Sequence, residues 1–441
     1  MDVTRRSDTV PGLGDYLDYR RNRLDFWTDT GELGPLVRVR FGRQEFWVVT
    51  DPDIAEHILL KAVKDYPRDR RLMALNRGPG PELMFNTDRW EEWRRRRRLL
   101  APGFRREAVE GFGPTIVRHA RRKADELAGV IDVQAEMREM TMRIILETMF
   151  SVTADHDVAR LQRTFEYASD VVAARASAPV TVPYWLPTPA NIRLLRLMRY
   201  RSSTLGKIIS DRVRTAQPQG DLLDLLILHH VDNDERGLTT RELIGEMSGI
   251  VFAGHETTAE TQAWLLHLVS THPHVEAGLR SEFESVLGDR DPTVQDLHNM
   301  PYTERVILET MRLYPAVYLT IREADVDHTV AGYDIPAGTR LVINIRGLQR
   351  DPFAWPDPDT FDPDRFCDDD GRHRFQYIPF LAGPKKCLGD HFAMLEMRLT
   401  IPTLLQRLRF YPATDKPPEP HAGFTLSVDG GLPMRAHQLG I

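Results

Sequence analysis

The sequence predicts a mainly α-helical protein with a smaller β-rich region, folded as a single domain over residues 1–441. Helical patterns dominate residues 90–313 and return at 387–408, whereas strand-like composition is concentrated at 30–60 and 316–345. Hydrophobic residues make up 41% of the chain and charged residues 28%, values typical of a globular protein with a large core. No linker-like tract separates these parts, so we expect one domain.

The first predicted elements are a hairpin and a short helix. Residues 36–41 and 45–50 have strand composition, and the turn between them contains Gly42. Asp51 and Pro52 end the second strand, and an amphipathic pattern predicts a helix over 53–60. Helical patterns then dominate from Trp90 to about Gly220. They are interrupted at 101–103 and 183–189.

The longest predicted helix begins at a capping box formed by Thr239 and Glu242 and continues to about Thr271. That length is enough to cross a whole domain. A further helix is predicted from about Tyr302 to Leu313. The remaining expected elements are a strand at 340–345, a proline-rich extended segment at 351–366 and a last helix from about Cys387 to Leu408.

Charge and cysteine content exclude several classes of protein. The net charge of −6 argues against a dedicated nucleic-acid binder. No run of about 18 apolar residues predicts a membrane span, and Arg5-Arg6 is not followed by the apolar stretch of a signal peptide. The only cysteines are Cys367 and Cys387, so no disulfide framework is expected. We therefore expect a cytoplasmic, monomeric protein without a membrane anchor.

The loop before the last helix has the features of a metal-binding thiolate site. Cys387 stands at a helix N-terminus, where the helix dipole and free backbone N–H groups favour thiolate. Gly383 and Gly389 let the backbone approach a flat ligand closely, and Phe380 could shield the sulfur from water. A shielded thiolate suits a soft or haem metal. An isolated cysteine would more simply be a buried apolar residue, which is what we expect of Cys367.

Two further patterns concern proton supply and carboxylate binding. In the long helix, small residues at Ala253 and Gly254 precede Glu256-Thr257, and an acid beside a hydroxyl can pass protons into a dry site. Arginine suits carboxylates, and Arg97 lies one helical turn after Trp93. Read alone, each of these could be an ordinary surface residue.

Together these motifs resemble the cytochrome P450 family, in family order, from about Pro11 to about Arg435. The family keeps Phe, Gly, a basic residue, Cys and Gly at the spacings found in 380–389, although Lys385 stands where Arg or His is usual. Residues 253–258 are similar to its oxygen-activation motif. The resemblance implies the cytochrome P450 fold, with haem between the long central helix and the helix that follows Cys387.

The resemblance also implies roles for individual residues. Cys387 would be the axial ligand of haem b (iron protoporphyrin IX), Thr257 would hold the bound oxygen and its water, and Glu256 would relay protons. Glu309, Arg312 and Arg365 would form a buried structural network. The residues assigned to the cofactor are Trp93, Arg97, Ala253, Gly254, Arg322, Phe380, Gly383, Lys385, Cys387 and Gly389.

The implied function is a monooxygenase that inserts one oxygen atom from O2 into a small apolar substrate. Segments that correspond to the family's specificity regions are mostly apolar, so we expect a terpenoid, polyketide or fatty-acyl compound. These segments are 68–85, 165–186, 316–319 and 423–425. Arg68, Arg70, Arg71 and Arg77 within the first of them could bind a carboxylate, but we expect them to be solvated loop arginines. The alternatives are a peroxygenase, isomerase or dehydratase of the family, or a haem sensor without turnover.

A separate ferredoxin and ferredoxin reductase are expected to supply electrons, because the chain has no room for a fused reductase. Arg97 would face the haem, while other members of the run 94–98 and Lys386 would form a basic patch. Ferredoxins are strongly acidic, so such a patch would favour their docking.

Overall fold

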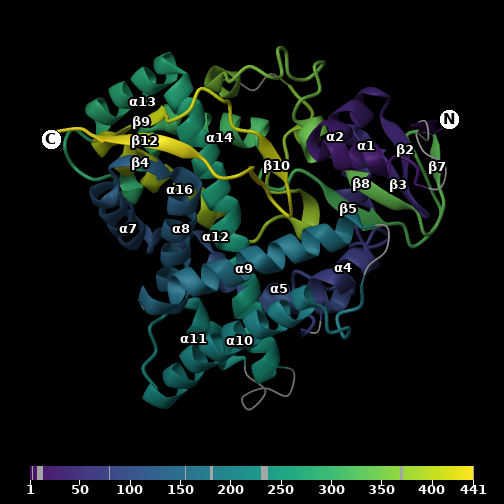
Figure 1. Ribbon diagram of the computed structural model, residues 1–441, viewed down its shortest axis with the longest axis horizontal. Coiled ribbons are helices and arrows are strands. Elements are labelled where there is room, and N and C mark those ends of the chain that lie inside the picture. The colour runs from purple at the N-terminus through teal and green to yellow at the C-terminus, as the bar shows by residue number, and fades with distance from the viewer. Residues whose placement is uncertain are drawn as a thin grey trace.

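The computed structural model describes residues 1, 3–6, 13–78, 80–153, 155–178, 182–229, 237–367 and 371–440. The β-sheet near the N-terminus and the helices α7, α8 and α13 lie at opposite ends of the molecule, and the C-terminus lies beside the latter (Figure 1). The prediction of a mainly helical protein with a smaller β-rich region is confirmed. No helix in the described part of the chain has both the length and the apolar character that a bilayer crossing requires.

The main sheet has the strand order β1-β2-β3-β8-β5. The predicted hairpin is present as antiparallel β2 and β3, whose apolar residues Val37, Val48 and Val49 are fully buried. β3 then pairs in parallel with β8, which places Val48 opposite Val342. The strands are β1 (Thr4–Arg5), β2 (Leu36–Phe41), β3 (Gln44–Val49), β5 (Thr320–Glu323) and β8 (Arg340–Ile343).

The helices form the larger part of the core. The longer ones are α5 (Trp90–Leu100), α7 (Gly113–Glu126), α8 (Val133–Phe150), α9 (Asp155–Ser177), α10 (Pro189–Thr215), α12 (Thr240–Thr271), α13 (Pro273–Val286), α14 (Pro301–Leu313) and α16 (Asp390–Arg407). The shorter ones are α1 (Tyr16–Arg21), α2 (Arg23–Glu32), α3 (Pro52–Glu56), α4 (Arg70–Arg77), α6 (Arg106–Glu110), α11 (Leu222–Leu228) and α15 (Ile345–Leu348). A π-helical turn, η1 (His57–Lys61), continues α3.

The predicted central helix is α12, and its capping box is present. The Thr239 hydroxyl accepts from the backbone N–H of Glu242, and the Glu242 carboxylate accepts from that of Thr239. Most of α12 is buried, since α8, α10, α14 and α16 pack around it. It is therefore the element on which the other parts of the molecule meet.

Several strands beyond the expected β-rich ranges were not predicted. β4 (Gly129–Asp132), β9 (Leu408–Pro412) and β12 (Pro433–Gln438) form a separate sheet. β10 (Pro420–Ala422) and β11 (Leu426–Val428) form a hairpin, whereas β6 (His328–Val330) and β7 (Tyr333–Ile335) pair within the expected range 316–345. These strands are short, and the partners of β12 come from distant parts of the chain, so local composition gives little sign of them.

Candidate active site

The Cys387 loop is a closed turn that ends just before α16. The backbone N–H of Cys387 donates to the carbonyl of Phe380 at 2.9 Å, and the N–H of Lys386 donates to that of Gly383 at 3.0 Å. The N-cap of α16 is Gly389, so the cysteine lies two residues before the cap. The prediction that the last helix starts at about Cys387 is therefore confirmed, with an offset of a few residues.

The ionisation of Cys387 differs from the expectation. Part of its side chain is exposed, yet the atoms packed around the sulfur raise the pKa of the thiol. A hydrogen bond from the Gly389 backbone and the charges of Arg97 and Lys386 act in the opposite direction but are outweighed. The helix terminus and these cations do not by themselves keep the sulfur ionised. A coordinated metal ion would do so, because it deprotonates a ligating thiol outright.

Packing within the protein explains one of the two loop glycines. Gly383 has a φ of 69°, and a Cβ there would lie 2.1 Å from the carbonyl oxygen of Leu59. Glycine at 383 is therefore required by the close approach of the π-helical turn η1. A Cβ at Gly389 would meet Phe104 at an ordinary 3.7 Å. Protein packing therefore accounts for glycine at 383, and the expectation that Gly389 lets the backbone approach a ligand stays a prediction.

Buried cations without carboxylate partners gather next to this loop. Arg322 is 2% exposed, and among the described residues it donates to the Thr320 hydroxyl and the Ile321 carbonyl only. Burial, with Arg68 nearby, lowers the pKa of Arg322 to about 9. Burial, with Arg322 and Arg68 nearby, likewise lowers the pKa of Lys385 to about 7. Lys385 also lies over the rings of Trp90 and Trp93, at 5.7 and 6.0 Å.

Arg97 and Arg68, which are half-buried, complete this group. Arg97 donates to the carbonyl of Lys386 at 2.9 Å, so it reaches the Cys387 loop as predicted, and it lies 5.6 Å from the Trp93 ring centre. Arg68 forms a β-bridge with Arg322 and donates to the carbonyl of Met84 at 2.7 Å. The expectation that Arg68 is solvated is wrong. Nothing in its local sequence distinguishes it from its neighbours, and the bridge that buries it comes from a distant segment.

This arrangement fits a haem. Within the described ranges, no carboxylate lies within ion-pair distance of Arg68, Arg97, Arg322 or Lys385, and a buried cation without a counter-ion is costly. The two propionates of a haem would place two negative charges among these four cations, and the Cys387 thiolate would hold its iron. A thiolate-ligated haem bound here supplies an electron-rich iron that favours cleavage of the O–O bond.

The acid–threonine pair of α12 is positioned by hydrogen bonds from two directions. The Thr257 hydroxyl donates to the carbonyl of Ala253 at 2.8 Å, which leaves its oxygen lone pairs available as acceptors. Glu256 is 6% exposed, and its Oε1 accepts from Thr425 at 2.6 Å and from Ser169 at 3.5 Å. Burial raises the pKa of Glu256, so its protonated form is favoured relative to an exposed glutamate.

Gly254 has a packing role that the sequence did not predict. A Cβ there would lie 2.0 Å from Cδ1 of Ile145 on α8. The glycine in the motif is therefore explained by the close packing of α12 against α8. The expectation that it makes room for a cofactor has no support in this contact.

The predicted structural network is present behind the site. Glu309 and Arg312 are both fully buried and form two hydrogen bonds of 2.7 Å. Arg365 lies 3.5 Å from Glu309 and also donates to the carbonyls of Pro356 and Asp357. Arg312 extends the network to the carbonyls of the same extended segment. It fixes the segment that leads to the Cys387 loop.

The arginine run 94–98 does not form the patch that was expected. Arg96 is 2% exposed and bound by Glu92, Glu242 and Glu246, so it joins α5 to α12. Arg95 is mostly covered and bound to Glu92 at 2.8 Å. The exposed members are Arg94 and Arg98, and Lys386 lies next to Asp390 at 2.6 Å. The basic patch is therefore smaller than predicted and excludes Arg96.

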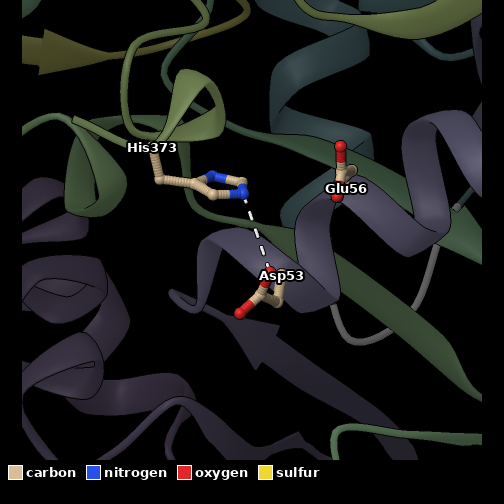
Figure 2. Close-up of side chains that lie close together, drawn as sticks. All are labelled: Asp53, Glu56 and His373. Atoms are coloured by element: carbon tan, nitrogen blue, oxygen red, sulfur yellow. Dashed lines mark ion pairs between the residues drawn. The ribbon is translucent and has the colours of Figure 1, made fainter. Parts of the chain in front are cut away.

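One other cluster of possible metal ligands lies elsewhere. Asp53, Glu56 and His373 bring their ligand atoms within 4.8 Å of one another (Figure 2). Glu56, however, is already bound to Arg374 and, at 2.6 Å, to Lys61. Hydrogen bonds from these two cations lower the pKa of Glu56 to about 2. Two positive charges on one of the ligands disfavour a cation there, and we assign no metal to this cluster.

Comparison with known proteins identifies the family. The family model described as "Cytochrome P450" matches residues 8–431. A cyclooctat-9-en-7-ol 5-monooxygenase of Streptomyces melanosporofaciens is 31% identical, over 92% of this chain and 88% of the relative. A pentalenene oxygenase of Streptomyces avermitilis is 29% identical, over 97% and 95%. A cyclooctatin synthase of Streptomyces melanosporofaciens is 28% identical, over 94% and 92%. The chain therefore belongs to the cytochrome P450 family and is a haem-dependent monooxygenase.

Proposed function

We propose that this monooxygenase oxidises a cyclic terpene, either a hydrocarbon or a singly hydroxylated one, with haem b as cofactor and electrons from a separate ferredoxin and its reductase. The observation that carries the substrate class is an apolar, largely aromatic surface beside Glu256 and Thr257. The names of the related bacterial enzymes, which act on pentalenene and on cyclooctat-9-en-7-ol, favour terpenes over polyketides and fatty acyl compounds.

Segments from distant parts of the chain converge on α12 to form this surface. Leu83 and Phe85 lie against α12, where a Cβ at Gly245 or Gly249 would be only 2.5 or 2.8 Å from them. The segment 316–319 lies beside the β10–β11 hairpin: the backbone N–H of Leu426 donates to Ala316, and the Tyr318 hydroxyl donates to Gly423. All of these residues belong to, or adjoin, segments predicted to set specificity.

Aromatic rings make up the part of this surface nearest the acid–threonine pair. The rings of Phe252 and Phe424 are 5.2 Å apart, and the buried ring of Phe165 packs against Phe252 at 6.1 Å. Rigid aromatic rings bind apolar molecules without offering them hydrogen bonds. A compact hydrocarbon matches this surface better than a polar polyketide, which would leave its oxygens unpaired.

The substrate class is tested by ligand binding and product analysis. Pentalenene and cyclooctat-9-en-7-ol, compared with a long-chain fatty acid and a macrolide, should be the ligands that shift the Soret band of the ferric protein. They should also give singly oxygenated products with NADPH, ferredoxin and reductase. A shift and oxygenation with the fatty acid or the macrolide, and none with either terpene, would refute the proposed class.

The proposed role of Thr257 is to hold bound oxygen and its water, with Glu256 as the proton donor. Glu256 is buried in α12, and the Thr257 oxygen can still accept hydrogen bonds. Thr257→Ala should still bind haem and substrate but divert NADPH electrons to hydrogen peroxide. Unchanged coupling of NADPH to product in this variant would contradict the assignment.

A further inference from the structure

Beyond Glu256, α12 carries a second buried acid on the same face. Glu260 lies one helical turn after Glu256 and is 0% exposed. Residues four apart on a helix have Cβ atoms about 5–6 Å apart, a distance that a carboxylate pair or one bridging water spans. An internal acid with no function would be replaced by an apolar residue at little cost, so Glu260 needs an explanation.

Both oxygens of Glu260 are held by α8. Arg138 donates to Oε1 from Nε at 2.6 Å and from its terminal nitrogen at 2.5 Å, and Gln134 donates to Oε2 at 2.7 Å. These contacts fix the carboxylate next to Glu256, with which it interacts electrostatically. Glu260 is therefore oriented rather than merely buried.

The same arginine leads from Glu260 to the solvent. Arg138 lies 3.3 Å from Glu166 of α9, whose side chain is 28% exposed. Ser169, one turn further along α9, lies 3.5 Å from Glu256. The acids Glu166, Glu260 and Glu256 thus form a series from the surface to the acid–threonine pair.

We propose that protons consumed at Glu256 are replaced from solvent along Glu166 and Glu260, with Arg138 holding the two carboxylates in place. A hydronium ion at the solvent-exposed Glu166 end gives a proton to Glu260 and becomes water, and Glu260 passes a proton to Glu256, which has just given one up. Each proton that leaves Glu256 is matched by one that enters, and no other group changes its charge. Glu260 acts through Glu256, so this inference rests on the proposed role of Glu256.

The electrostatics of the series suit this task. Burial, opposed by Arg138 and Gln134, raises the pKa of Glu260 to about 7, so both of its protonation states are populated near neutral pH. The charged or polar groups facing Glu260 are Arg138 and Gln134 from α8 and Glu256 from α12 itself, whereas Glu166 and Asp170 from α9 act on Glu256. Against its own burial, the neighbouring acids raise the pKa of Arg138, which therefore stays charged and does not carry the proton.

The first test needs no substrate. In the holoenzyme, the infrared difference between wild type and Glu260→Gln should contain the C=O band of a protonated carboxyl. That band should lose intensity as the pH is raised through neutrality. A Glu260 that stays ionised at every pH at which the protein is folded would overturn the proposal.

The second test measures turnover with pentalenene as probe. Glu260→Gln should lower O2- and NADPH-driven product formation by about tenfold and raise its solvent deuterium isotope effect. Product formation driven by hydrogen peroxide, which arrives already reduced and protonated, should stay within about twofold of wild type. The matched control is Glu136→Gln, which changes an acid of α8 bound to Lys123 and should behave as wild type.

The outcomes separate this inference from the proposals on which it rests. An unchanged rate and isotope effect in Glu260→Gln, or an equal loss of peroxide-driven activity, would overturn the relay. If Glu260→Gln does not fold, Glu166→Gln at the partly exposed end decides by the same criteria. Wild-type behaviour of Glu256→Gln would refute the role of Glu256 itself. Failure of pentalenene as a substrate would concern only the proposed substrate, and the infrared test would then decide.

Discussion

At the scale of single residues, replacing the two cysteines should have opposite effects on haem ligation. With CO and reductant, the wild type should give the long-wavelength Soret band that thiolate ligation produces. Cys387→Ser should lose this band, because its loop position beside Arg97 and Lys385 is the only candidate for an axial thiolate. Cys367→Ser should keep it, since that cysteine is exposed at the end of a 3-10 turn. A Cys387→Ser protein with the band intact would refute the assignment.

Arg322 should stabilise the holoenzyme and destabilise the apoprotein. Arg322→Leu removes a buried cation without a carboxylate partner, so the apoprotein should gain about 1–3 kcal/mol in free energy of unfolding. The same change removes a donor to a propionate and should raise the dissociation constant for haem about tenfold. Thermal unfolding of the apoprotein and transfer of haem to apomyoglobin measure the two effects.

The control for this pair of effects is Arg346→Leu. Arg346 is another arginine whose pKa is lowered by burial, but it donates to Thr28, away from the cation group beside Cys387. Its replacement should leave haem transfer unchanged. Slower haem transfer from Arg322→Leu than from wild type would contradict the proposed contact.

At the scale of elements, the close packing of α12 against α8 depends on the absence of a Cβ at Gly254. Gly254→Ala would place a Cβ 2.0 Å from Cδ1 of Ile145. Overpacking of this kind costs about 1–3 kcal/mol, more than the roughly 1 kcal/mol that alanine gains in helix propensity. We therefore expect a net loss of stability in urea unfolding, although alanine is the better helix former.

A double-mutant cycle separates the steric cause from others. Ile145→Val removes the Cδ1 atom that is contacted, so Gly254→Ala should cost less in the Ile145→Val background than in wild type. Equal costs in the two backgrounds would mean that the glycine is required for a different reason, such as space for the cofactor.

At the scale of the whole molecule, the exposed cations near the Cys387 loop should govern reduction by ferredoxin. The first electron transfer should slow as salt rises from about 0.05 to 0.5 M, because the Debye length falls from about 14 Å to about 4 Å. Arg98→Glu should slow it further without changing substrate affinity, because Arg98 is exposed and has no ion-pair partner among the described residues. The control is Arg214→Glu, at the end of α10. A reduction rate indifferent to salt and to Arg98→Glu would place the donor elsewhere.

Sequence alone gave the family, the fold class and the position of Cys387, because these depend on local motifs. It could not distinguish Arg96 from Arg98, because both lie within the same run of arginines. Glu242 and Glu246, about 150 positions away in the sequence, bind and bury Arg96 but not Arg98. Arg68 was misjudged for the same reason, since its partner is a strand 254 positions later. The single-domain organisation stays a prediction, which limited proteolysis can test.

The turn of the β10–β11 hairpin carries two functions side by side: contact with the substrate and orientation of the proton-donating acid. Phe424 at its tip borders the apolar surface, and the adjacent Thr425 holds the carboxylate of Glu256. A library that varies this turn to admit larger or differently shaped molecules also shifts the hydroxyl that orients the acid. A broader substrate range would then be accompanied by a loss of NADPH electrons to side products, because the two functions belong to adjacent residues. Varying position 424 while keeping Thr425 should therefore change substrate selectivity without lowering the coupling of O2 and NADPH consumption to product.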